Sequence, residues 1–161
     1  MTQIVTADLY DKYEDELRIA LPIFNDYGSN IEFMGTAVTL KVYEDNTLVR
    51  AALEEKGDGQ VLVVDGGESM RCALVGDMLA ELGVKNGWKG IIVAGCIRDS
   101  AVIKGLDIGV KAMNTNPRKS VKKGAGDRDI SINIAGITIN PGDFIYADAD
   151  GVVVSDKVLE L

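Results

Sequence analysis

Residues 61–94 read VLVVDGGESMRCALVGDMLAELGVKNGWKGIIVA, and this stretch decides the fold. It opens and closes on short apolar runs, at residues 61–64 and 91–94, which are typical of strands covered on both faces of a sheet. Between the runs, apolar residues recur at helical spacing from Met78 to Leu82. Strand, helix and strand in this order predict two parallel strands joined by a right-handed crossover.

The flanking segments extend this βαβ unit into a larger α/β pattern. Thr6 and Asn46 are candidate N-caps of two helices, and three further short segments read as a strand, a helix and a strand. These elements are expected at residues 6–13, 33–42, 46–56, 100–104 and 109–113. Short apolar runs separated by Gly and Pro turns make the end of the chain rich in strands. We expect a single domain over residues 1–161, a layered β/β/α sandwich with a central βαβ unit and a strand-rich C-terminal part.

Charge and hydropathy exclude several functional classes. The formal net charge of −8 argues against a general nucleic-acid binder, because such proteins need a basic surface to neutralise phosphates. No apolar run approaches the ~18 residues that span a bilayer, so neither membrane insertion nor a location outside the cytoplasm is expected. One basic run, RKSVKK at residues 118–123, is either a solvated loop or a docking patch for an acidic partner.

The chain has two cysteines and no histidine, which narrows its chemistry. A structural zinc site normally takes four Cys or His ligands, and catalytic Ser-His or Cys-His pairs need a histidine base. Cys72 and Cys96 are interpreted as small buried hydrophobes in a reducing compartment. The remaining chemistry must use carboxylates, Arg, Lys, Tyr, water and metal.

Three segments are expected to converge at the carboxyl edge of the parallel strands, where open α/β sheets bind ligands. The helix that begins near Gly76 offers backbone N–H groups for an anion, and Arg98 offers a planar fork for a carboxylate. Asp99 offers hard oxygen suited to Mg²⁺ or Mn²⁺, so the edge would suit a 2-oxo acid. The alternative is purely structural: Asp99 caps the following helix, and Arg98 pairs with a surface carboxylate.

From end to end the chain resembles the family named for the regulator of ribonuclease activity A. The segments that carry the resemblance are AVTL (37–40), YEDN (43–46), VLVVDGG (61–67), VGDMLA (75–80), GCIRD (95–99), PGD (141–143) and ADADG (147–151). Part of this family consists of metal-dependent aldolases that cleave 4-hydroxy-4-methyl-2-oxoglutarate and 4-carboxy-4-hydroxy-2-oxoadipate to pyruvate and also decarboxylate oxaloacetate. The other part consists of non-catalytic regulators that bind and inhibit ribonuclease E.

The resemblance implies roles for particular residues and a swivelling phosphohistidine-domain-like fold. Asp77 and Arg98-Asp99 match the aldolase signature of Asp, twenty residues and Arg-Asp. It implies that Gly76, Asp77, Met78 and Leu79 hold substrate oxygens, that Arg98 holds the substrate carboxylate and enolate oxygen, and that Asp99 anchors the metal. It also implies a homotrimer with sites at subunit junctions. Two features depart from the resemblance: Val102 stands where many aldolases have an acidic residue, and the sequence ends at Leu161 without the longer C-terminal extension of some aldolases.

Overall fold

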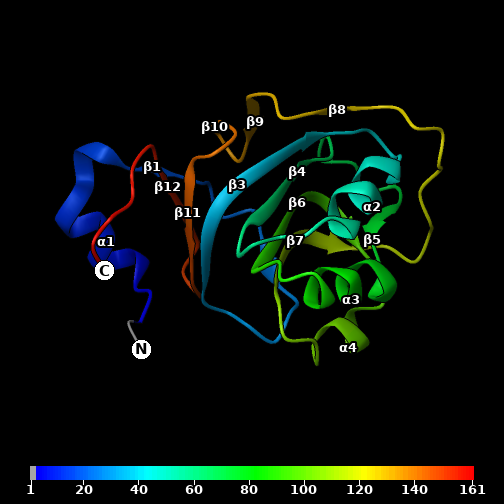
Figure 1. Cartoon of the computed structure of the whole chain (residues 1–161), viewed down its shortest axis with the longest axis horizontal. Coiled ribbons are helices and arrows are strands. Elements are labelled where there is room, and N and C mark those ends of the chain that lie inside the picture. The colour runs from blue at the N-terminus through cyan, green and yellow to red at the C-terminus, as the bar shows by residue number, and fades with distance from the viewer. Residues whose placement is uncertain (1–2) are drawn as a thin grey trace.

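The computed structural model describes residues 3–161, which form one curled mixed sheet with few helices (Figure 1). The strands along the sheet follow the order β1-β12-β11-β3-β4-β6-β7-β2, and β5 and β8 pair beside this path. Their bounds are β1 Arg18–Ile19, β2 Asn25–Asp26, β3 Phe33–Lys41, β4 Val61–Asp65, β5 Ala73–Val75, β6 Gly90–Ile97, β7 Gly109–Thr115, β8 Asp127–Arg128, β11 Phe144–Ala147 and β12 Val152–Ser155. A separate hairpin consists of β9 Ile132–Ile134 and β10 Ile137–Ile139.

The curl of the sheet originates at β3, which pairs with different neighbours along its length. Its first four residues, 33–36, pair antiparallel with β11. Its last five, 37–41, pair parallel with β4, which in turn pairs parallel with β6, and β6 with β7. The single strand β3 therefore belongs to both the parallel part of the sheet and the antiparallel C-terminal part.

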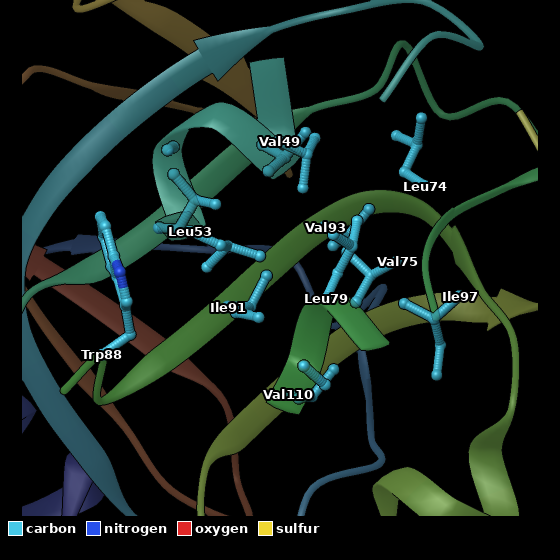
Figure 2. Close-up of a cluster of buried hydrophobic side chains, with 14 of the residues drawn as sticks. Val49, Leu53, Leu74, Val75, Leu79, Trp88, Ile91, Val93, Ile97 and Val110 are labelled. Carbon is cyan, nitrogen blue, oxygen red and sulfur yellow. The ribbon is translucent and has the colours of Figure 1, made fainter. Parts of the chain in front are cut away.

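The helices are α1 Thr6–Tyr13, α2 Thr47–Glu54, α3 Asp77–Lys85 and α4 Ser100–Ile103, with a 3₁₀ turn at Glu14–Glu16. Helices α2, α3 and α4 lie together on one side of the parallel strands, and α1 lies at the far end of the molecule (Figure 1). Apolar side chains from α2, α3 and the facing strands form the core beneath them, in which Leu53 and Ile91 are fully buried (Figure 2). The hairpin β9–β10 supplies Ile132 and Ile139 to a second core on the opposite face. The α/β layering is thus confirmed.

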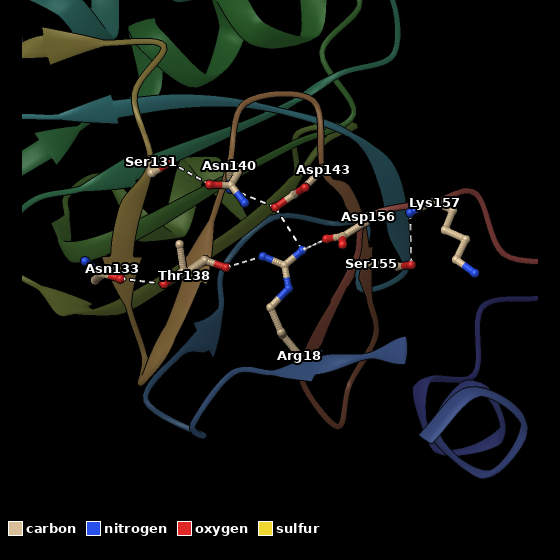
Figure 3. Close-up of polar contacts among 9 residues, drawn as sticks. All are labelled: Arg18, Ser131, Asn133, Thr138, Asn140, Asp143, Ser155, Asp156 and Lys157. Atoms are coloured by element: carbon tan, nitrogen blue, oxygen red, sulfur yellow. Dashed lines mark hydrogen bonds and ion pairs between the residues drawn. The ribbon is translucent and has the colours of Figure 1, made fainter. Parts of the chain in front are cut away.

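Arg18 ties the antiparallel part together (Figure 3). Its guanidinium lies 2.9 Å from Asp143 and 2.7 Å from Asp156, and it also donates to the Thr138 carbonyl. These contacts join β1, the middle of β10, the turn before β11 and the residue after β12. Asp143 is largely buried, and Arg18 is the counter-charge of its carboxylate.

The predicted elements of the βαβ unit are confirmed, with one addition: β5 lies between β4 and α3 and pairs with β6. The prediction that Thr6 caps α1 is wrong, because its backbone N–H and hydroxyl both donate to the buried Asp148 carboxylate instead. Asn46 occupies the N-cap position of α2 but makes no side-chain cap. No helix within residues 3–161 has both the length and the apolar character needed to cross a membrane.

Candidate active site

A pocket of about 110 Å³ lies where the sequence predicts a ligand site, beside the end of β6 and the start of α3. All six residues predicted for the site line it: Gly76, Asp77, Met78, Leu79, Arg98 and Asp99. The pocket is also lined by Asn46, Arg50, Ala73, Lys119, Ser120 and Lys122. The structure thus brings the predicted residues together, while their chemical roles stay predictions.

Asp99 follows β6 with its backbone in the left-handed region, at φ 58° and ψ 37°. Asp is among the few non-glycine residues that adopt this conformation without severe strain. The side chain makes no capping bond to α4; its Oδ2 accepts the Asp77 N–H at 3.1 Å. The structural alternative, in which the Asp99 carboxylate caps the next helix, is therefore not what the structure shows.

Gly76 is required at the start of α3 by space and not by backbone angle. Its φ of −117° and ψ of −170° are open to any residue. A Cβ at this position would lie only 2.8 Å from Asp99 Oδ2 and 3.5 Å from two side-chain atoms of Arg98. The missing side chain thus lets the helix start approach the two residues that end β6.

The first N–H groups of α3 bind carboxylate oxygens in this structure. Asp99 Oδ2 accepts from the Asp77 N–H, and Asp77 Oδ1 accepts from the Met78 N–H at 2.8 Å. The unpaired N–H groups and the dipole of a helix N-terminus favour such anions. Asp77 and Asp99 thus occupy part of the anion site that the sequence predicts here.

Arg98 is positioned by its backbone, and its guanidinium is left largely free. Its N–H donates to the Val75 carbonyl at 2.9 Å, which anchors the end of β6 beside β5. The side chain makes one long hydrogen bond, 3.4 Å to the Pro117 carbonyl. Among residues 3–161 it forms no ion pair, so the expected alternative of a surface carboxylate partner is not seen.

One part of the pocket lining was not predicted from the sequence. We call it the basic wall, formed by Lys119, Ser120 and Lys122 together with Asn46. The sequence pattern alone predicts that the basic run at residues 118–123 is a solvated loop or a docking patch. Two of its lysines instead face the same pocket as Arg98. The sequence shows the close spacing of the basic residues, but the local pattern does not determine where this segment lies in the fold.

Asp45 explains how the basic wall is held. This residue is 2% exposed, and its carboxylate accepts from the Thr47 N–H at 3.0 Å and the Thr47 hydroxyl at 2.7 Å. Its other oxygen accepts from the N–H groups of Lys123 at 2.9 Å and Ala125 at 3.2 Å. Burial raises the pKa of the Asp45 carboxyl, but these hydrogen bonds outweigh burial and lower that pKa to about 2.

A divalent cation fits the donors at this edge, although only sparsely. Within residues 3–161 no group of three or more His, Cys, Asp or Glu side chains could hold a metal. Mg²⁺ often binds through one or two carboxylates and keeps several waters. Asp99 supplies such a carboxylate, its one hydrogen bond leaves acceptor capacity free, and Gly76 leaves space beside it. Neither histidine nor cysteine supplies a metal ligand here, because the chain has no histidine and Cys72 and Cys96 are buried free thiols.

Comparison with known proteins agrees with this geometry. The family model described as RraA-like, Aldolase/RraA, matches residues 6–154. A protein of Alkalilimnicola ehrlichii, provisionally named 4-hydroxy-4-methyl-2-oxoglutarate aldolase, is 57% identical over 156 residues that cover 97% of each chain.

Two solved structures share this fold and are 40% and 49% identical in sequence to this chain. The RNA-processing inhibitor RraA from Thermus thermophilis is 40% identical with a TM-score of 0.95, covering 99% of this chain and 96% of that one. A Geobacillus kaustophilus protein, described as an S-adenosylmethionine: 2-dimethylmenaquinone methyltransferase, is 49% identical with a TM-score of 0.95, covering 97% of both. The relatives thus carry different functional names on one fold. The chain itself belongs to the RraA-like family.

Proposed function

We propose that this chain is a divalent-metal-dependent class II aldolase. In this proposal it cleaves 4-hydroxy-4-methyl-2-oxoglutarate, and also 4-carboxy-4-hydroxy-2-oxoadipate, to pyruvate, and it decarboxylates oxaloacetate as a side activity. The observation that carries the proposal is the meeting of Arg98 and Asp99 with the start of α3 in one pocket. The aldolase name of the 57% identical relative supports it.

The start of α3 and Arg98 would bind the 2-oxo acid end of the substrate. A substrate carboxylate would take over the N–H groups that Asp77 and Asp99 now occupy, while the Arg98 fork fixes its orientation. Arg98 would also place positive charge beside the 2-oxo group, where negative charge develops as the C–C bond breaks. Binding and charge stabilisation would thus come from the same side chain.

Asp99 would hold Mg²⁺ or Mn²⁺ together with waters. When bound, such an ion polarises a substrate carbonyl and stabilises developing negative charge as a Lewis acid. The chain has no histidine, so proton transfer would run through water oriented by the carboxylates of Asp77 and Asp99. Besides the metal ion and water, the proposed reaction therefore uses only side chains that line the pocket.

Pyruvate release from oxaloacetate and from 4-hydroxy-4-methyl-2-oxoglutarate tests this function. The rate is measured with a coupled assay in the presence of Mg²⁺ or Mn²⁺, and again after a chelator is added. We expect metal-stimulated release that the chelator abolishes and added metal restores. Purified protein that releases no pyruvate with any of these metals would contradict the proposal.

The second candidate is a protein regulator that binds and inhibits ribonuclease E. The likeness to the Thermus RNA-processing inhibitor favours it. With a net charge of −8 such an interaction would be protein–protein, without direct nucleic-acid binding. A titration with ribonuclease E measures the protein–protein interaction. A titration with structured and single-stranded RNA at physiological salt tests for direct RNA binding. Submicromolar RNA affinity would refute this form of regulation.

The methyltransferase name of the Geobacillus relative receives no support from the pocket. Sites for drug-sized ligands and cofactors usually enclose roughly 300 Å³ or more, whereas this pocket measures about 110 Å³. A dicarboxylic acid of the proposed size is a better match.

We also infer that the protein is a homotrimer. The family resemblance motivates this inference, and large exposed apolar side chains that line the pocket or stand close in sequence to its lining residues support it. Tyr43, Met78 and Val121 are 61%, 65% and 49% exposed, respectively. Burying such side chains against a second subunit would be favourable. Light scattering measures the mass, and a monomer at micromolar concentration would contradict the inference.

A further inference from the structure

The basic wall has no task in the reaction as described so far. Arg98 and the start of α3 would take the 2-oxo acid end of the substrate. Beyond the bond that breaks, a substrate of the proposed class carries a hydroxyl and a second carboxylate on the same carbon. Asn46, Lys119, Ser120 and Lys122 line the same small pocket as Arg98.

The two lysines of the basic wall have uncompensated charge. Neither Lys119 nor Lys122 forms an ion pair with any residue that the structure describes. The chain has a net charge of −8, so its overall charge does not explain two cations without acidic partners beside one pocket. They are well placed to bind a second anionic group, because charge-assisted hydrogen bonds to carboxylates are the strong ones.

Two polar atoms of the basic wall lack hydrogen-bond partners. Ser120 is 6% exposed, and its hydroxyl has no partner within residues 3–161. The Asn46 Oδ1 likewise has none, although its Nδ2 donates to the Leu74 carbonyl at 3.3 Å. Buried polar atoms are nearly always satisfied, so such exceptions need a cause. Both oxygens are shielded from water in this structure, and the Ser120 hydroxyl reaches a ligand by rotation about its Cα–Cβ bond.

The types of these atoms define the ligand. A hydroxyl group and two ammonium groups donate to a carboxylate, whereas the Asn46 Oδ1 only accepts, so it matches a ligand hydroxyl. A hydroxyl beside a carboxylate satisfies all four groups of the basic wall. An anion without a hydroxyl, such as sulfate, would leave the Asn46 acceptor unpaired.

The segment that carries these residues is held mainly by Asp45 and its neighbours. In Figure 1 it is the yellow trace that passes α2 and β5 on its way to β8. The Asp45 carboxylate binds the N–H groups of Lys123 and Ala125, and the Glu44 carbonyl accepts the Val121 N–H at 3.0 Å. The other oxygen of the same carboxylate accepts from the N–H and hydroxyl of Thr47 at the start of α2. Asp45 therefore fixes the basic wall relative to α2 without lining the pocket.

We propose that the basic wall is a subsite for a 2-hydroxycarboxylate group, the end of the substrate beyond the scissile bond, and that Asp45 is its positioning residue. This inference rests on the proposed function for its place in the reaction, but it concerns binding and can be measured without turnover. The subsite would select substrates whose leaving half carries both a hydroxyl and a carboxylate.

The first experiment compares two dicarboxylic acids by calorimetry, without metal. These probes, 2-hydroxy-2-methylsuccinate and 2-methylsuccinate, differ only in the hydroxyl. We expect the wild type to bind the hydroxy acid about tenfold more tightly, which corresponds to one hydrogen bond between neutral groups. Equal binding of the two acids, or no binding of either, would overturn the subsite. This result stands whether or not the protein releases pyruvate.

Variants then assign the preference to residues. Asn46→Ala should reduce the hydroxyl-dependent preference to below about threefold, because it removes the acceptor for the ligand hydroxyl. Ser120→Ala should weaken both acids alike and leave the melting temperature unchanged or higher, because an unpaired buried hydroxyl stabilises nothing. Lys122→Met should weaken both acids about tenfold. Lys123→Met is the matched control, because this neighbouring side chain does not line the pocket. Equal effects of the two lysine variants would overturn the assignment.

Asp45→Asn tests the positioning role, with the exposed Asp127→Asn as control. We expect amide hydrogen exchange at Lys123 and Ala125 to accelerate at least tenfold in Asp45→Asn alone. In the aldolase assay the KM for the hydroxy substrate should rise several-fold with little change in kcat. Unchanged exchange at both amides would overturn the role of Asp45.

Discussion

Gly76→Ala would test whether the close approach of α3 to the end of β6 matters for activity. The backbone angles at Gly76 suit alanine, so the effect is purely a collision of the new Cβ with Asp99 Oδ2. The 2.8 Å between the new Cβ and Asp99 Oδ2 falls about 0.6 Å short of ordinary contact, which begins at 3.4 Å. Either the carboxylate or the start of the helix must therefore move by roughly that amount.

The size of the effect follows from this displacement. Moving Asp99 weakens its bond to the Asp77 N–H, which costs about 1 kcal/mol of stability. Metal–ligand distances tolerate only about 0.2 Å, and a misplacement on the order of 1 Å at an active site can cost about a hundredfold in rate. We expect kcat/KM for pyruvate release to fall about thirtyfold to a hundredfold, while the melting temperature falls by only a few degrees.

Gly105→Ala is the matched control for this variant. Its new Cβ would lie 3.6 Å from the nearest atom, the Val102 carbonyl oxygen, which is ordinary contact. The assays are coupled pyruvate release for activity and calorimetric melting for stability. Wild-type activity in Gly76→Ala, or an equal loss in Gly105→Ala, would refute the argument that Gly76 keeps the site open.

Three further predictions concern single carboxylates and one arginine. Asp99→Asn should leave the fold intact but lower metal-stimulated pyruvate release on the order of a thousandfold, and near-normal rates would reject Asp99 as the metal anchor. Arg18→Met should reduce the free energy of unfolding by about 2 kcal/mol in urea, since it leaves the buried Asp143 unpaired; a loss below about 0.5 kcal/mol would contradict this. Because the folded pKa of Asp45 is about 2 and its ordinary value is 3.8, its contribution to stability is present above pH ~4 and is lost as pH falls through 2. Between pH 5 and 2 the melting temperature should therefore fall less steeply for Asp45→Asn than for the wild type. An equal decrease in both proteins would contradict this prediction.

The sequence predicted those parts of the fold and site that local pattern determines. The apolar runs of β4 and β6 and the helical spacing of α3 placed Gly76, Arg98 and Asp99 at one edge. The strands β1, β2 and β8 have two residues each, too few for any periodicity, and they form only because longer strands pair with them.

The basic wall could not be placed from the sequence because long-range contacts determine its position. Asp45 binds N–H groups 78 and 80 residues further along the chain, and no local pattern encodes such a pairing. The cap of α2 was missed for a different reason. Asn46 and Asp45 are both good capping residues, and the carboxylate of Asp45, one position earlier, takes the Thr47 N–H.

The double pairing of β3 has a consequence for the order of events during synthesis. Residues 37–41 find their β4 partner soon after they emerge, but residues 33–36 wait for β11, which lies more than 100 residues later. Until then half of the strand is an open edge that can pair with other nascent chains. Helix α1 and the C-terminal end lie on the same side of the molecule in Figure 1, and Lys12 lies 3.8 Å from Glu160. A circular permutant that begins just before β9 would deliver β11 first and close this edge as soon as β3 is made.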